Sequence, residues 1–140
     1  MEITINYWGV MGAAIANMIV GMLWYGPVFG KTWRKLMGFS ETDMKKMPLT
    51  AGQAIAGGTI TALLMSYILA HEAFVWGSFM GESGTVFFAF MLAFWPWLGF
   101  VATTQAGSFL WEGKSFKLFA FNAAASMVSM FAMALVLTFI

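Results

Sequence analysis

The 140-residue chain has no cysteine, one histidine and few charged residues, which make up 9% of its length. The lack of cysteine excludes disulfide bonds, thiolate catalysis and cysteine-ligated metal or iron–sulfur sites. A single histidine, His71, does not suffice for a conventional structural zinc site. Titratable groups are too few for a serine–histidine–aspartate set, and no phosphate-binding glycine motif occurs. We therefore predict no metal, no cofactor and no enzymatic activity.

The scarcity of charge also excludes the soluble globular class, in which about a quarter of residues are charged. Here 61% of the residues are hydrophobic, and a soluble domain of this size could not cover so much apolar surface. The net charge of +1 gives no indication of nucleic acid, and we expect no such partner. The N-terminus lacks the basic region of a cleavable signal peptide. We read residues 1–140 as one transmembrane domain in a lipid bilayer.

Four apolar runs are long enough to cross the bilayer, for which a helix needs about 20 residues. They cover residues 8–29, 51–70, 85–106 and 116–139. None shows the strict alternation of a barrel strand, and an open strand would leave its backbone unpaired in lipid. The sequence therefore predicts an all-α integral membrane protein, a bundle of four transmembrane helices.

The basic residues indicate how the chain is oriented. All seven fall in the first and third predicted loops or, for Lys117, at the adjoining helix end, and these segments share one side of the membrane: Lys31, Arg34, Lys35, Lys45, Lys46, Lys114 and Lys117. Loops rich in Lys and Arg stay in the cytoplasm. We therefore predict that both termini lie outside.

The first basic loop has a helical pattern of its own. Trp33, Leu36 and Met37 share one face, which predicts a short interfacial helix that ends at Gly38. Ser40 then resembles the N-cap of a second short helix. This loop could bind anionic lipids or a soluble partner, through Lys31, Arg34, Lys35, Lys45 and Lys46, or it could only anchor the topology.

Small residues recur every four positions in the first two predicted helices. One stripe is Gly9, Ala13, Asn17 and Gly21; the other is Ala54, Gly58 and Ala62, with Gln53, Gly57 and Thr61 beside it. Such stripes let helix backbones approach closely in lipid. We expect the two helices to pack together and to leave surface for another subunit; a cleft around a ligand is the alternative.

Polar residues concentrate in the predicted cytoplasmic half. A candidate polar pocket comprises Asn17, Gln53, Thr103, Thr104, Gln105, Asn122 and Ser126. Buried amides and hydroxyls in lipid need partners, so these residues either hydrogen-bond between helices or line a wet pocket. We expect every charged residue to lie in a loop or at a helix end, which argues against ion-coupled transport.

A proline stands between two tryptophans in the third predicted helix. Pro96 removes a backbone donor and predicts a kink. The indole N–H groups of Trp95 and Trp97 need acceptors, for which the carbonyls freed by the kink and Asn17 are candidates. The two rings could form an aromatic floor for a flat ligand, or they could only fill the bundle.

Several segments resemble a family of bacterial membrane proteins known as domain of unknown function 1761. They are Gly21-Met22-Leu23-Trp24-Tyr25-Gly26-Pro27, Phe29-Gly30-Lys31-Thr32-Trp33, Trp97-Leu98-Gly99-Phe100 and Leu110-Trp111-Glu112-Gly113-Lys114. The resemblance implies a four-span architecture and no assigned activity. It points to a signature at the cytoplasmic interface, comprising Trp24, Tyr25, Pro27, Trp33, Trp111, Glu112 and Lys114. The signature has two halves, one around Trp24, Tyr25 and Pro27 and the other around the turn from Glu112 to Lys114. We expect these two halves to form one surface.

Together these features predict a multi-pass protein of a bacterial inner (cytoplasmic) membrane. The leading interpretation is a non-enzymatic structural or binding protein that acts as a homo-oligomer or as an accessory subunit of a membrane complex. The alternative is a small carrier or channel with a polar pocket in the cytoplasmic half of the bundle. A carrier needs a cavity that reaches past Trp95 and Trp97, whereas an accessory subunit should be dry there.

Overall fold

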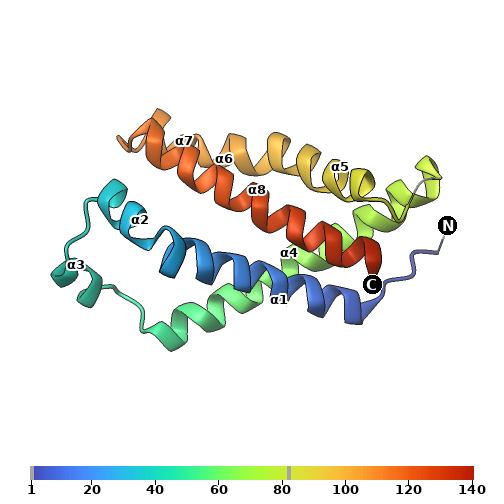
Figure 1. Ribbon diagram of the computed structural model, residues 1–140, viewed down its shortest axis with the longest axis horizontal. Coiled ribbons are helices and arrows are strands. Elements are labelled where there is room, and N and C mark those ends of the chain that lie inside the picture. Colours follow the sequence, from blue (N-terminus) through green and yellow to red (C-terminus); the bar gives the residue numbers. More distant parts are fainter. Residues whose placement is uncertain (1, 82) are drawn as a thin grey trace.

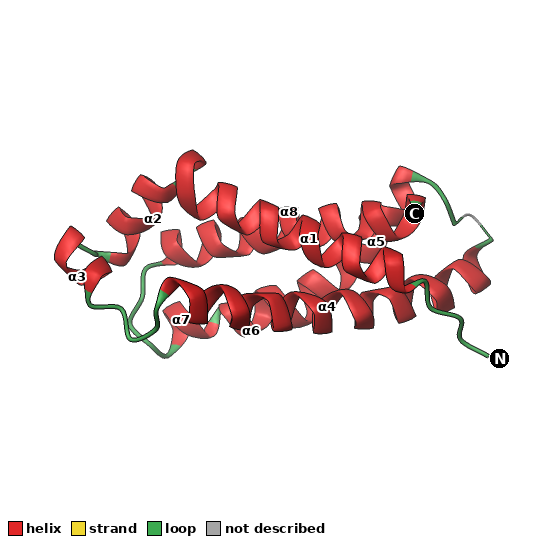
Figure 2. Ribbon diagram, turned by 90° about the horizontal axis from the view of Figure 1, so that it is seen from below, coloured by secondary structure: helices red, strands yellow, loops and turns green. Residues whose placement is uncertain are grey.

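The computed structural model describes residues 2–81 and 83–140, and in this part of the chain it contains helices and loops but no strand. The long helices run side by side along one axis (Figure 1, Figure 2). In chain order the elements are α1 (Tyr7–Leu23), the π-helix η1 (Trp24–Val28), α2 (Gly30–Met37), α3 (Glu41–Lys45), α4 (Ala51–Met80), α5 (Val86–Pro96), the π-helix η2 (Trp97–Ala102), α6 (Thr103–Gln105), α7 (Gly107–Leu110) and α8 (Phe116–Phe139).

Four helical segments are long and apolar enough to cross a membrane, as the sequence predicted. They are Tyr7–Val28, Ala51–Met80, Val86–Leu110 and Phe116–Phe139. The all-α, four-span prediction is thereby confirmed. The predicted end of the second span at residue 70 is wrong, because α4 continues to Met80. The residue that caps its end, Gly81, has a left-handed conformation (φ 67°). Glu72 consequently lies within this helix and not at its end.

Helix α8 is the centre of the bundle. It packs against α1 on one side and α5 on the other, while α4 packs mainly against α1. The core is built from alanines and a few larger side chains: Ala13, Leu69, Phe88, Ala89, Leu92, Ala93, Met130, Met133 and Ala134. Leu92 and Met133 are fully buried. The alanines let the helix axes approach, and this packing holds helices together where lipid removes the hydrophobic drive.

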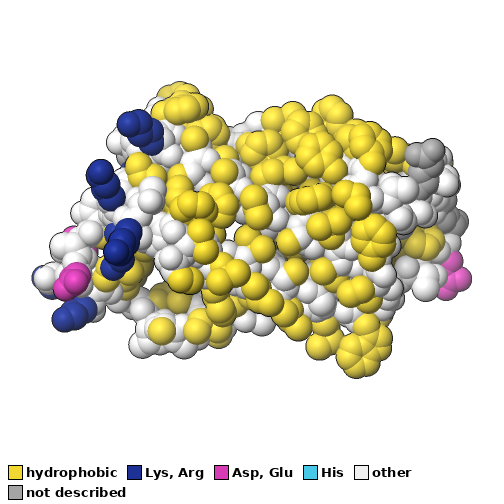
Figure 3. All heavy atoms as spheres, viewed as in Figure 1, with side chains coloured by type: hydrophobic (Ala, Val, Ile, Leu, Met, Phe, Trp, Pro, Cys, Tyr) yellow, Lys and Arg dark blue, Asp and Glu magenta, His cyan; other side chains and the backbone are white. Residues whose placement is uncertain are grey.

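The molecule has two chemically different ends. Both termini lie at one end (Figure 1), where the Asn6 side-chain amide donates a hydrogen bond to the Ile140 carbonyl at 3.1 Å. We call this the terminal end. At the other end lie α2, α3 and the start of α8, the segments that carry or adjoin all seven Lys and Arg residues. Blue side chains gather there in Figure 3, and we call this the basic end.

Helices α1 and α4 touch over only part of their length. Ala13 and Ala62 are fully buried, and a Cβ atom at Gly58 would contact Met18 at 3.7 Å. Toward the basic end the helices separate, and residues 51–57 of α4 are all exposed. A Cβ atom at Gly21 or Gly57 would meet nothing within 4 Å. The predicted small-residue stripes therefore pack in their terminal-end halves and stay open in their basic-end halves.

The two short helices of the first loop form where the sequence predicted them. Helix α2 ends at Gly38 in the left-handed conformation (φ 72°), and the Phe39 N–H closes the turn on the Arg34 carbonyl at 2.9 Å. Helix α3 begins after Ser40, whose hydroxyl accepts from the Asp43 N–H. The Asp43 carboxylate in return accepts from the Ser40 N–H at 2.8 Å. This reciprocal capping satisfies donors that would otherwise be free.

Candidate functional site

Two side-chain hydrogen bonds join the helices near the basic end. The Tyr25 hydroxyl donates to the Asn122 side-chain oxygen at 2.7 Å and so links η1 to α8. The Ser126 hydroxyl lies 3.2 Å from the Gln105 side-chain oxygen and so links α8 to α6. Both pairs are partly buried, and each connects residues that are far apart in sequence. These bonds supply the partners that polar groups need in an apolar environment.

Trp97 completes this group of polar contacts from the turn after Pro96. The helix changes there from α5 to the wider η2, as expected where a proline removes a backbone donor. The Trp97 indole N–H donates to the Ala123 carbonyl of α8 at 2.8 Å and lies 3.2 Å from the Ser126 hydroxyl. The acceptor of the Trp97 indole is therefore a carbonyl on the neighbouring helix α8. It is neither Asn17 nor a carbonyl freed by the kink in its own helix.

Trp95 points away from this group. Its side chain is 49% exposed and lines a surface groove with Trp76, Phe79, Met80 and Met91. Trp97 instead packs against the core. The two indoles therefore do not form a common aromatic floor.

A cavity of about 200 Å³ opens between the α6–α7 segment and α8. We call it the polar cavity, and it is lined by Thr104, Gln105, Gly107, Ser108, Glu112, Phe119 and Asn122. It brings Glu112 of the signature together with three residues of the predicted polar pocket. In the described part of the chain, no three His, Asp or Glu side chains gather as a metal site would require. The lining is suited to hydrogen bonding of a small polar group.

The other residues of the predicted pocket lie elsewhere. Gln53 caps its own helix, accepting from the Thr50 N–H at 3.0 Å, and is exposed. The Thr103 hydroxyl donates to the Gly99 carbonyl at 2.7 Å and is exposed as well. Asn17 accepts from Ser129 of α8, outside the group around the polar cavity. Local capping explains Gln53, because a Thr and a Gln three positions apart satisfy each other at a helix start.

The signature residues of the first segment form an aromatic cluster on α8. Trp24 lies 4.7 Å from Phe29 and 5.6 Å from Phe121 between ring centroids. Tyr25 makes edge contacts with Phe121 and Trp33, both at 5.8 Å. Pro27 also lies in η1, between Tyr25 and Phe29 in the sequence. The edge-to-face geometry of the two Tyr25 contacts adds stability beyond the buried area.

The second signature segment lies across α8 from the first. Glu112 lines the polar cavity, Lys114 is exposed, and Trp111 is 86% exposed at the end of α7. The link between the two halves is Asn122, which binds Tyr25 and also lines the polar cavity with Glu112. The surface predicted from the signature is thus divided by α8.

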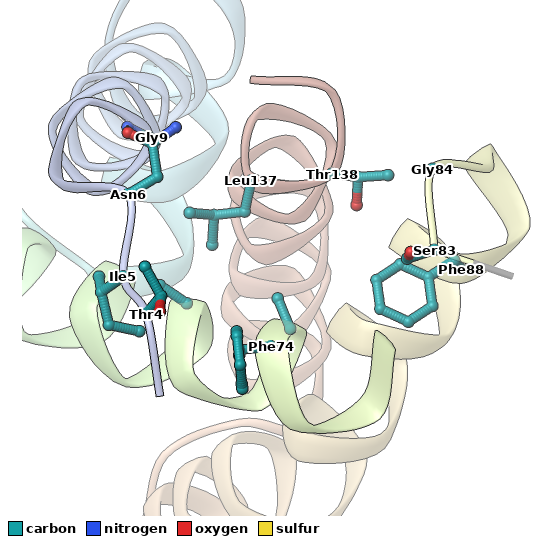
Figure 4. Close-up of a pocket in the computed structure, with 12 residues that line it drawn as sticks. Thr4, Ile5, Asn6, Gly9, Phe74, Ser83, Gly84, Phe88, Leu137 and Thr138 are labelled. Carbon is teal, nitrogen blue, oxygen red and sulfur yellow. The ribbon is translucent and has the colours of Figure 1, made fainter. Parts of the chain in front are cut away.

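A second pocket, which no sequence pattern indicated, occupies the terminal end (Figure 4). It has a volume of about 190 Å³, and its lining includes the hydroxyl residues Thr4, Ser83 and Thr138 together with Asn6. The Thr138 hydroxyl oxygen is buried without a hydrogen-bond partner among the described residues. Leu92 and Met133 of the packed core lie between the two ends of the bundle and are fully buried.

The fold, with its four long apolar helices, defines a polytopic helical membrane protein. The chain belongs to the family described as protein of unknown function (DUF1761), whose family model matches residues 8–138. The match covers nearly the whole chain, so the resemblance of the tryptophan-rich segments is confirmed. No curated protein and no solved structure matches the chain.

Proposed function

We propose that the protein is a non-enzymatic structural or binding protein of a membrane assembly, in which α4 contacts a second copy or another membrane subunit. The open face of α4 supports this proposal. Gln53, Gly57 and Thr61 follow one another every four residues, and all three are exposed. The Thr61 hydroxyl is already bonded to its own helix, to the Gly58 carbonyl at 2.9 Å. The polar groups of Gln53 and Thr61 are thus engaged within α4, and Gly57 between them adds no side chain to the face.

Gly57 is the observation that carries the proposal. A Cβ atom there would meet no atom within 4 Å, so the fold of a single chain does not require glycine. Glycine in a helix interior costs about 1 kcal/mol relative to alanine. In lipid this cost is offset when a second helix packs closely against the glycine. A helix that faced only lipid would gain nothing from it.

The carrier or channel interpretation has a weaker basis. The polar cavity at the basic end supports it, because a transported solute would need such a site. The core beyond it argues against a passage, since Leu92, Ala93 and Met133 have no exposed surface. Between the polar cavity and these core residues, the Trp97 indole N–H also donates to the Ala123 carbonyl of α8. We therefore keep this function as the second candidate, with the polar cavity as its site.

Native mass spectrometry of the protein, released gently from its membrane, tests the first proposal. The wild type is expected to appear as a discrete oligomer or in a complex with other subunits. Gly57→Leu should lower the assembled fraction about tenfold or more, because the side chain would separate helices that pack through glycine. Ala56→Leu adds similar bulk on a neighbouring exposed face and should leave assembly nearly unchanged.

The outcomes separate the candidates. A homo-oligomer sensitive to Gly57→Leu supports self-association, whereas a heteromeric complex supports the accessory role. A wild type that is entirely monomeric contradicts the proposal. A small polar molecule retained by the monomer, and lost when Gln105 is replaced by leucine, would favour the second candidate instead.

A further inference from the structure

A further cavity lies where the end of the first transmembrane helix meets the two short helices. It has a volume of about 310 Å³ and is lined by Tyr25, Gly26, Gly30, Trp33, Arg34 and Met44. We call it the headgroup cavity. Its aromatic residues, Tyr25 and Trp33, are the types that concentrate at the boundary between lipid and water. It occupies the basic end, next to the predicted surface helix α2.

Arg34 is the basic residue that lines this cavity. Its side chain is partly buried, whereas Lys31 and Lys35 on the same helix are exposed. Its Nε donates to the Gly30 carbonyl at 3.4 Å, which orients the guanidinium and leaves its two terminal nitrogens for another acceptor. A guanidinium binds a phosphate with two parallel hydrogen bonds, which a lysine cannot do.

The charges around the headgroup cavity favour an anion. Lys31, Lys35, Lys45 and Lys46 lie on the same two short helices or directly after them. The acidic residues nearby are Glu41, which is exposed, and Asp43, whose carboxylate accepts from the Ser40 N–H at 2.8 Å and hydroxyl at 2.9 Å. Two acidic residues do not balance the five basic ones, so the region stays positive. Such a concentration of basic residues beside a transmembrane helix attracts anionic lipid headgroups.

An apolar cavity adjoins the headgroup cavity and shares Met44 with it. Its volume is about 350 Å³, and it is lined by Met44, Met47, Pro48, Leu49, Thr50, Ala51 and Ala54. It lies along the open start of α4, where residues 51–57 stand away from α1. A cationic, aromatic cavity beside an apolar one matches a molecule with an anionic head and a hydrocarbon tail.

We propose that these two cavities together bind one anionic phospholipid, with its phosphate on Arg34 and an acyl chain along Met44, Met47 and Ala54. This inference is independent of the proposed function, since it does not involve the Gly57 stripe. The apolar cavity distinguishes a lipid from a free phosphate. A phosphate ion would use Arg34 alone and would gain nothing from the wall formed by Met47 and Ala54.

The test uses the full-length protein in nanodiscs and in detergent, with phosphatidylglycerol or phosphatidylcholine as the probe. Native mass spectrometry should show one retained phosphatidylglycerol and little phosphatidylcholine. Arg34→Gln should weaken retention about tenfold or more, because it removes a charge-assisted, two-pronged contact. Lys35→Gln removes the same charge from an exposed neighbour and should weaken it by less than about threefold. Equal losses in the two variants, or no preference for phosphatidylglycerol, would overturn the proposal.

A second variant tests the binding of the acyl chain and leaves the charge of Arg34 unchanged. Ala54→Leu should fill part of the apolar cavity and reduce lipid retention, even if Arg34→Gln fails to fold. Glycerol phosphate, which has the anion but no chain, should displace little of the lipid when added at equal concentration. Efficient displacement, together with normal retention by Ala54→Leu, would assign the site to a free phosphate compound and refute the lipid. The oligomeric state, read in the same spectra, reports separately on the Gly57 stripe.

Discussion

Gly30 is the residue on which the backbone of the basic end depends most directly. A Cβ atom at this position would lie 2.8 Å from the Tyr25 carbonyl oxygen, closer than such atoms approach one another. Gly30 starts α2 directly after the π-helical turn, and its own carbonyl accepts from Arg34. The close approach therefore positions the Tyr25 ring and the Arg34 guanidinium at the same time.

We expect Gly30→Ala to lower the free energy of unfolding by about 1–3 kcal/mol, the usual cost of forcing an extra carbon into a packed site. The contact is to backbone, so it cannot be relieved by a side-chain rotation. Gly21→Ala is the control, because a Cβ atom there meets nothing within 4 Å; this variant should be neutral or stabilised by up to about 1 kcal/mol. Denaturant unfolding in mixed micelles measures both. Equal stability of the two variants would contradict the predicted contact.

Some residue pairs could not have been found from the sequence. Tyr25 and Asn122 are 97 positions apart, and Asn17 and Ser129 are 112 apart. Pairing across helices depends on the rotation and depth of each helix, and hydropathy determines neither. The polar character of Asn122 and Gln105 did predict that they would find partners. Gln53 was misplaced because its partner, Thr50, is local and competes with any partner on another helix.

Among the elements, α3 depends on its capping box more than on packing. It has five residues, none of them buried, so its hydrogen bonds at Ser40 and Asp43 largely decide whether it forms. Both Ser40 donors bind the Asp43 carboxylate and hold its pKa below the ordinary value near 3.8. The ionised form is therefore the one that caps the helix.

The capping bonds predict how α3 responds to pH. Because the pKa of Asp43 is lowered in the folded protein, its contribution is fully present above about pH 4. It is lost as the pH falls through the lower, folded value. The protection factors of the α3 amides, which correct for the intrinsic slowing of exchange in acid, should therefore fall as the pH drops, while those of the long helices stay high. Asp43→Asn should abolish this dependence on pH, and an unchanged acid response in that variant would show that another group is responsible.

The sequence predicted the long helices well because membrane insertion depends on local hydropathy. The short helices were also predictable, since Ser40 and Gly38 are local start and stop signals. The length of α4 was not, because His71 and Glu72 interrupt the apolar run. The backbone hydrogen bonds of a helix do not require apolar side chains, so α4 continues to Met80. The two π-helices also went unforeseen, although Pro27 and Pro96 marked where the regular bonding would change.

For the whole molecule, the distribution of charge determines the expected orientation in the membrane. All seven Lys and Arg residues belong to segments at the basic end, so we expect this end in the cytoplasm and both termini outside. The chain has no cysteine, which makes single introduced thiols a clean test. In intact cells, a membrane-impermeant maleimide should label Thr4→Cys, whereas Thr42→Cys should react only after permeabilisation. The reverse pattern would refute the orientation.

The separation of α1 and α4 toward the basic end has a consequence for stability. A bilayer leaves no empty space between diverging helices, so on our proposal hydrocarbon chains fill the apolar cavity beside Ala51 and Ala54, away from the Gly57 stripe. Those chains replace part of the protein interior and contribute contacts that no side chain supplies. Any molecule that binds the folded state more strongly than the unfolded state raises its stability. The free energy of unfolding of this protein is therefore a joint property of the chain and its solvent, and it has no single value apart from the lipid composition in which it is measured.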